Sequence, residues 1–263
     1  MRIHRTSLGI VAAMTLATLG GVASLAAVAQ GAQGQITVAA AISMKDALGG
    51  LANEFSARPG AARAELTFGA SGILEKQIEE GAPIDVFISA APAEMNTLGQ
   101  KGLLVAGTRR DVAGNRLVLV VPTGTTMVKD VEDLKKPEVR TIAIGETRSV
   151  PAGQYAAEAL RNLKLFETLK PKFVFAQNVR AVLAYVADRD ADAGFVYETD
   201  AKITDRVAIA SALPASSYTP VVYPAAVIRG SQNPAGAQTF IEFLESPEAR
   251  TIFQKYGFTP PSH

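Results

Sequence analysis

The sequence predicts an α/β protein of two hinged lobes, each a mainly parallel sheet flanked by helices. Short apolar runs alternate along the chain with segments that carry apolar residues at helical spacing. Two long apolar runs, 115–122 and 220–228, stand out from this alternation and indicate strands at which the chain crosses between lobes. The 263 residues, 48% of them hydrophobic, are enough to bury two small cores.

Residues 1–29 have the form of a secretory signal peptide. A short basic start precedes a long uncharged apolar stretch, and the small residues of "AVA" at 27–29 fit a cleavage site. Gly20 and Gly21 interrupt the apolar run, which argues against a retained membrane anchor. We therefore expect an exported chain that is located in the periplasm.

The first lobe is expected from residues 30–119 together with 224–263. Ala47, Leu48, Leu51 and Phe55 recur at helical spacing behind Ser43, which predicts a helix with a serine N-cap. The strands expected here are 36–41, 64–68 and 84–90, and the helices are 43–57, 73–80, 91–102 and a tail broken at Pro247.

The second lobe is expected from residues 120–223. Val182, Leu183 and Val186 share one face of a predicted helix, and Pro151 suits the first position of another. The strands expected here are 140–145, 172–177 and "RVAIA", and the helices are 130–136, 151–163 and 178–190. Residues 193–201 are expected to be a strand that runs into the start of another helix.

Composition excludes several classes of function. The chain has no cysteine, which excludes disulfides, thiolate metal sites and thiol catalysis. Its two histidines, His4 and His263, lie in the signal and at the last position, so a Ser-His-Asp hydrolase and a histidine-ligated metal site are not expected. Without the signal, 24 basic residues face 25 acidic ones, and this balance argues against nucleic acid as a partner.

Four predicted helices begin directly after strands without an acidic residue at their caps. They start at Ser43, at Ser71-Gly72, at Val150-Pro151 and at Asn178. Because the first N–H groups of a helix have no partner within it, these starts offer free donors at the carboxyl ends of the strands. Such uncharged ends together form a receptor for an anion.

The donors expected at this receptor are the backbone and hydroxyl groups of Ser43 and Ser71 and the N–H groups of Ala152 and Val179. Tyr197 adds a phenolic hydroxyl from the end of a strand. A set rich in donors and poor in acceptors favours a fully deprotonated oxyanion. Taken singly, each residue also has an ordinary explanation as a cap, turn or core residue, and Arg180 is expected to face solvent or to pair with an acid.

The chain resembles the periplasmic molybdate-binding proteins of ABC importers from about residue 36 to 261. The segments that carry the resemblance are "ITVAAAISMKDAL", "FGASGILEKQIEEGAPIDVFISA", "GNRLVLVVP", "VPAGQYAAEAL", "NVRAVLAYV", "GFVYETDA" and "YGFTPP". The resemblance implies a type II periplasmic binding protein fold and a tetrahedral oxyanion, molybdate or tungstate, held between the lobes.

The family's binding positions fall on Ser43, Ser71, Ala152, Val179 and Tyr197, which all match in residue type. The turn "GASG" departs from the family pattern, since relatives carry more serines there. The resemblance further implies a protein without catalytic residues or cofactor, in which molybdenum is bound as its oxyanion with no direct cation ligands. It also implies delivery to a membrane ABC permease, and we expect a monomer.

The residues alone leave two other hypotheses about the function open. A receptor for another ion, such as sulfate or ferric iron, is one, although ferric iron favours clustered tyrosines and the six tyrosines here are scattered. A secreted carboxylate-dependent enzyme is the other, with Asp85, Glu146, Glu198 and Asp200 as the acids nearest the expected strand ends.

Overall fold

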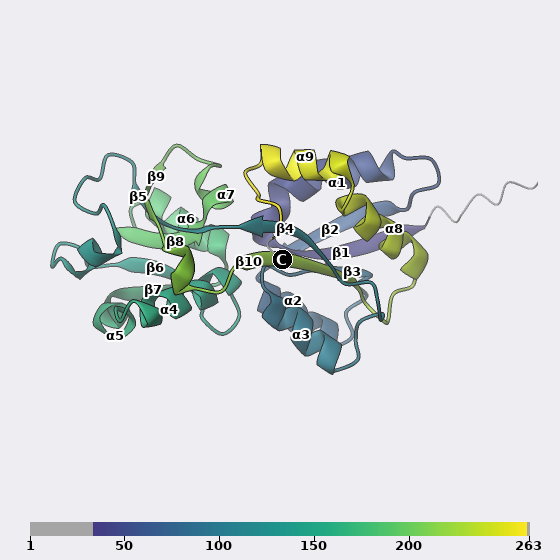
Figure 1. The fold of residues 1–263 in the computed structure, drawn as a ribbon, viewed down its shortest axis with the longest axis horizontal. Coiled ribbons are helices and arrows are strands. Elements are labelled where there is room, and N and C mark those ends of the chain that lie inside the picture. The colour runs from purple at the N-terminus through teal and green to yellow at the C-terminus, as the bar shows by residue number, and fades with distance from the viewer. Residues whose placement is uncertain (1–33, 262–263) are drawn as a thin grey trace, which may run out of the picture. The chain divides into compact units, whose positions relative to one another are not determined.

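A computed structural model describes residues 34–261, and the predicted signal peptide lies outside this part of the chain. The described residues form two sheets of five strands, each flanked by helices (Figure 1). The prediction of an α/β protein with two lobes is therefore confirmed. No helix in residues 34–261 is both long enough and apolar enough to span a membrane.

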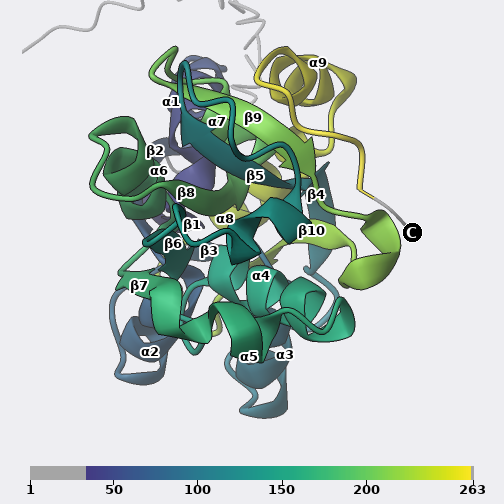
Figure 2. The same cartoon turned by 90° about the vertical axis from the view of Figure 1, so that its left-hand side faces the viewer.

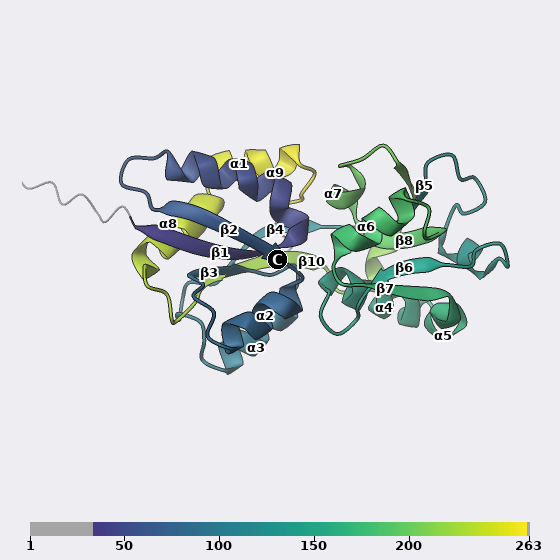
Figure 3. The same ribbon diagram turned by 180° about the vertical axis from the view of Figure 1, so that it is seen from behind.

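The first sheet has the strand order β2-β1-β3-β10-β4. Its strands are β1 (Gln35–Ala41), β2 (Arg63–Gly69), β3 (Val86–Ile88), β4 (Arg110–Asn115) and β10 (Val221–Val227). Helices cover both faces, with α1, α8 and α9 on one side and α2 and α3 on the other (Figure 3). These helices are α1 (Lys45–Ser56), α2 (Ser71–Glu79), α3 (Pro92–Gln100), α8 (Pro234–Leu244) and α9 (Pro247–Lys255).

The second sheet has the strand order β7-β6-β8-β5-β9. Its strands are β5 (Leu117–Pro122), β6 (Ile142–Gly145), β7 (Phe173–Ala176), β8 (Ala193–Tyr197) and β9 (Val207–Ala212). Its helices are α4 (Pro151–Asn162), α5 (Phe166–Leu169), α6 (Val179–Ala187) and α7 (Glu198–Ala201). Figure 2 shows α6 and α7 on one side of this sheet and α4 and α5 on the other.

Three adjacent strands in each sheet pair in parallel, namely β2, β1 and β3 in the first and β7, β6 and β8 in the second. One strand in each sheet, β10 or β5, runs opposite to the other four. The strands next to the crossings pair antiparallel, so both sheets are mixed. The run 115–122 is two strands rather than one, because Asn115 pairs with Val221 in the first sheet and Leu117 with Tyr197 in the second. The sheet changes at Arg116 and again between β9, which ends at Ala212, and β10, which begins at Val221.

One local prediction at the start of the first lobe is wrong. Ser43 does not cap a helix, because a short 3-10 turn, Ile42–Met44, follows β1 and α1 begins only at Lys45. The short helix predicted at 130–136 is present as a 3-10 helix, Val131–Lys135, in which Asp130 caps the N–H groups of Glu132 and Asp133. The short strand β4 and the short helix α5 were not predicted from the sequence.

Candidate functional site

A small cavity lies between the two lobes, at the carboxyl ends of the six strands that pair in parallel. Its volume is about 10 Å³, far below the ~300–1,000 Å³ of pockets for drug-sized ligands, so it suits only a small ion. The residues that line it are Ala41, Ile42, Ser43, Gly69, Ala70, Ser71, Ala90, Val150, Pro151, Ala152, Val179 and Tyr197. Within residues 34–261, no lysine, arginine, aspartate or glutamate lines this cavity.

The cavity brings together all five residues that the sequence proposed as ligand donors. Ser43 and Ser71 come from the first lobe, after β1 and β2. Ala152, Val179 and Tyr197 come from the second lobe, after β6, β7 and at the end of β8. The carboxyl ends of two parallel strand sets thus face one another, as expected of a ligand site in open α/β sheets.

Three helices begin at the cavity with small or apolar residues. No hydrogen bond described for residues 34–261 uses the backbone N–H of Ser71, Ala152 or Val179, which lie in the first turns of α2, α4 and α6. None of these helices has an acidic residue in its first turn. Each therefore presents a free donor and the positive end of its dipole to the cavity.

Gly153 allows the start of α4 to lie this close to the second sheet. A Cβ atom on Gly153 would lie 2.0 Å from the carbonyl oxygen of Gly145, the last residue of β6. Because that neighbour is backbone, it cannot move aside as a flexible side chain could. The glycine therefore sets the approach of helix to strand that brings the N–H of Ala152 to the cavity.

The hydroxyls of the two serines each already have one partner in the protein. Ser71 Oγ accepts a hydrogen bond from the N–H of Ala90 at 3.0 Å, so the serine proton remains available to another acceptor. Ser43 Oγ lies 3.1 Å from the hydroxyl of Tyr223, which the sequence did not single out. Both serines are buried, so an unused proton can find an acceptor only in the cavity.

The hydroxyl of Tyr197 is a hydrogen-bond donor without a partner in residues 34–261. Its side chain is 1% exposed, and its hydroxyl has no hydrogen-bond partner in the described structure. Burial and the neighbouring tyrosines and acids raise its pKa, so the hydroxyl keeps its proton. A buried hydroxyl without a partner costs roughly 1–3 kcal/mol, and a ligand that accepts its hydrogen bond would recover that cost.

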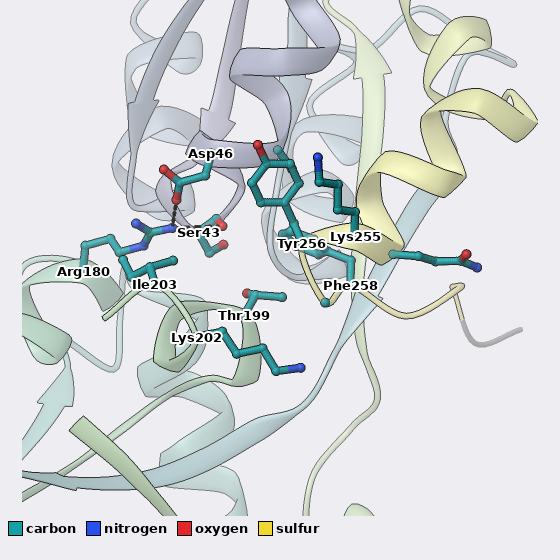
Figure 4. Close-up of a pocket in the computed structure, with 12 residues that line it drawn as sticks. Ser43, Asp46, Arg180, Thr199, Lys202, Ile203, Lys255, Tyr256 and Phe258 are labelled. Carbon is teal, nitrogen blue, oxygen red and sulfur yellow. Dashed lines mark hydrogen bonds and ion pairs between the residues drawn. The ribbon is translucent and has the colours of Figure 1, made fainter. Parts of the chain in front are cut away.

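Arg180, the residue after Val179, is held away from the cavity by two acids. Arg180 donates to Asp200 at 2.5 Å and to Asp46 at 2.7 Å, and its guanidinium lines a neighbouring groove rather than the cavity (Figure 4). Burial raises the pKa of Asp200 to about 6, although Arg180 acts against the shift. The expectation that Arg180 faces solvent or pairs with an acid is settled as a pairing with two acids.

Several contacts join the lobes around the cavity. The Arg180–Asp46 ion pair is one, and the N–H of Gly72 donates to the carbonyl of Ser149 at 3.0 Å. Gln154 Nε2 donates to Glu94 at 3.1 Å, and burial raises the pKa of this glutamate. These contacts border the cavity-lining residues, so the described arrangement is one in which the lobes are closed over the cavity.

The acids that would serve an enzyme have partners in the protein instead. Asp85 accepts from the N–H of Thr37 and from Ser231, and Glu198 pairs with Arg116 and Lys202. Asp200 bonds Arg180, as described above, and Glu146 accepts from the N–H of Arg148. None of the four lines the cavity.

Comparison with known proteins agrees with this architecture. A family model described as "Bacterial extracellular solute-binding protein" matches residues 36–259. The molybdate-binding protein ModA of Haemophilus influenzae is 37% identical over 233 residues, which cover 87% of this chain and 91% of the relative.

Two solved structures are also similar. The substrate-binding domain of a putative molybdenum ABC transporter from Clostridium difficile shares 38% identity at a TM-score of 0.69, covering 87% of this chain and 99% of that one. The periplasmic molybdate-binding protein of Azotobacter vinelandii shares 27% identity at a TM-score of 0.77, covering 87% and 100%. The chain belongs to the family of bacterial extracellular solute-binding proteins.

Proposed function

We propose that this protein captures molybdate between its lobes and delivers it to a membrane ABC permease. One observation carries the proposal: in the described part of the chain, a small cavity without charged side chains is lined by free N–H groups and by a buried tyrosine hydroxyl that has no partner. The molybdate-binding relatives named above support the choice of this ion. Ser43, Ser71, Ala152, Val179 and Tyr197 are the proposed ligand-binding residues.

Binding by neutral donors suits a doubly charged tetrahedral oxyanion. Each oxygen can accept hydrogen bonds from N–H and O–H groups, and the helix dipoles balance the charge without a cation in contact. The closed lobes exclude water, and in the resulting low dielectric each hydrogen bond is stronger than in solvent. Molybdate is thus a transported ligand, and no catalytic residue or cofactor is part of the proposal.

Size separates molybdate from sulfate, since both are tetrahedral dianions that would satisfy the same donors. Tungstate, which the family resemblance includes, is expected to bind as well. Ferric iron has less support, because it favours anionic oxygen ligands and the cavity offers a single tyrosine. We further propose that the mature protein is a monomer in the periplasm.

Calorimetric titration of the purified protein tests this function. Molybdate and tungstate should bind tightly and sulfate weakly, and elemental analysis of protein from molybdate-supplemented cells should find molybdenum. Affinity for sulfate equal to that for molybdate would remove the basis for the assignment.

A further inference from the structure

We propose that Asn115 and Tyr223 are positioning residues that fix the Ser43 hydroxyl as a hydrogen-bond donor to the bound oxyanion. This inference rests on the proposed function, since it assigns a direction to one hydrogen bond of that site. Neither residue lines the cavity. Both act through Ser43, from which Tyr223 is 180 residues distant in sequence.

Asn115 has one orientation that satisfies its neighbours. Its Oδ1 accepts a hydrogen bond from the N–H of Arg116 at 2.9 Å. The other atom of the amide, which faces Tyr223 and Thr199, is therefore Nδ2. Nδ2 donates to Tyr223 Oη at 3.1 Å and to Thr199 Oγ1 at 2.9 Å. Both protons of the amide are used, so Asn115 offers Tyr223 a donor and no acceptor.

The proton of Tyr223 then has one acceptor. In the described structure Tyr223 Oη has two hydrogen-bond partners, Asn115 and Ser43, and the amide nitrogen cannot accept. The side chain is fully buried, and burial raises its pKa so that the proton is retained. The tyrosine therefore donates to Ser43 Oγ across the 3.1 Å that separate the two oxygens.

Ser43 Oγ thus accepts the hydrogen bond from Tyr223, and the serine's own proton remains free to be donated. Its side chain lines the cavity and is buried, so its proton points to the ligand. Ser71 reaches the same state through the N–H of Ala90. Because both serines are held as donors, neither can accept the proton of an oxyanion that is still protonated. The hydrogen-bond relay from Asn115 through Tyr223 to Ser43 thereby favours a fully deprotonated ion.

A double-mutant cycle separates this role from simple support of the fold. Tyr223→Phe should weaken molybdate binding about three- to tenfold, the range of one net hydrogen bond. Ser43→Ala should weaken it by about tenfold or more, as for a hydrogen bond to a charged group. If Tyr223 acts through Ser43, adding Tyr223→Phe to Ser43→Ala should change the affinity by less than about twofold.

Tyr218→Phe is the matched control. Tyr218 is also buried, and its hydroxyl accepts from the N–H of Leu117 at 3.1 Å; neither residue lines the cavity. This variant loses a comparable structural hydrogen bond and should bind molybdate like the unmodified protein. Two results would overturn the proposal. One is that Tyr223→Phe weakens molybdate binding equally in the protein with Ser43 and in the Ser43→Ala variant. The other is that Tyr223→Phe alone leaves the affinity unchanged.

Neutron diffraction from deuterated crystals gives a test that does not depend on the ligand. The deuteron between Tyr223 and Ser43 should be bonded to the tyrosine oxygen. A deuteron bonded to Ser43 there would refute the proposed direction. Failure of the unmodified protein to bind molybdate, with the deuteron as expected, would reject the proposed function and leave the relay standing.

Discussion

Replacing Tyr197 with phenylalanine removes one oxygen and should affect stability and affinity differently. Among residues 34–261 the hydroxyl has no hydrogen-bond partner, and its side chain is 1% exposed, so the substitution removes no hydrogen bond of the described structure. We therefore expect the ligand-free variant to be at least as stable as the unmodified protein. Binding loses a hydrogen bond to a charged acceptor, worth about 1.5–3 kcal/mol, which corresponds to a roughly 10- to 150-fold weaker affinity.

Calorimetry with molybdate gives the affinity, and thermal unfolding with and without molybdate gives the two stabilities. Saturating ligand should raise the melting temperature of the variant less than that of the unmodified protein, because the stabilisation follows the ratio of ligand concentration to Kd. Tyr155→Phe is the control, since this hydroxyl is also buried and unpartnered in the described structure but lies outside the cavity lining. Unchanged affinity combined with a lower ligand-free melting temperature would show that the Tyr197 hydroxyl serves the fold and not the ligand.

Three further substitutions probe the charges around the cavity. Ala152→Asp places a carboxylate on a cavity wall without charges, so calorimetry should find molybdate binding reduced by at least tenfold; normal affinity would mean that this residue does not face the ion. Glu94→Gln tests a carboxyl whose pKa burial raises above 4.5. An acid with a raised pKa in the folded state lowers the stability as pH rises above its unfolded-state pKa. The stability of the variant relative to the unmodified protein, measured by denaturant unfolding, should therefore be greater at pH 8 than at pH 5. An equal difference at both pH values would contradict this assignment. Asp46→Ala breaks the ion pair with Arg180 across the lobes and should speed molybdate dissociation about two- to fivefold in stopped-flow measurements. Glu54→Ala, the same charge change on the same helix, should leave the dissociation rate unchanged. Equal rates for the two variants would exclude a role of the ion pair in closure of the lobes.

The sequence was sufficient for the features that depend on local pattern. Apolar runs and helix starts placed most strands and helices, because burial periodicity and capping act over a few residues. The cavity residues could be grouped for a related reason. Each follows a strand end, and parallel strands bring their carboxyl ends to one edge of a sheet.

The sheet change at Arg116 could not be read in the same way. Residues on both sides of Arg116 are buried strand residues, and an apolar run does not reveal which sheet its hydrogen bonds join. Only the pairing partners, Val221 for Asn115 and Tyr197 for Leu117, show where one sheet ends.

The residues behind Ser43 were missed because their contacts are distant in sequence. Tyr223 is 180 residues from Ser43 and 108 from Asn115, and no spacing rule covers such separations. The prediction of Ser43 as an N-cap was wrong for a related reason. Tyr223 takes the serine hydroxyl into a tertiary contact, and the 3-10 turn that follows β1 moves the start of α1 to Lys45.

Anomalous X-ray scattering at the molybdenum edge, from crystals grown with molybdate, tests the central claim most directly. We expect one molybdenum peak in the cavity, with its oxygens at hydrogen-bond distance from the N–H groups of Ala152 and Val179, both serines and Tyr197. Arg180 should remain bonded to its two aspartates. A peak held by lysine or arginine side chains, or no peak between the lobes, would contradict capture of the ion by uncharged donors.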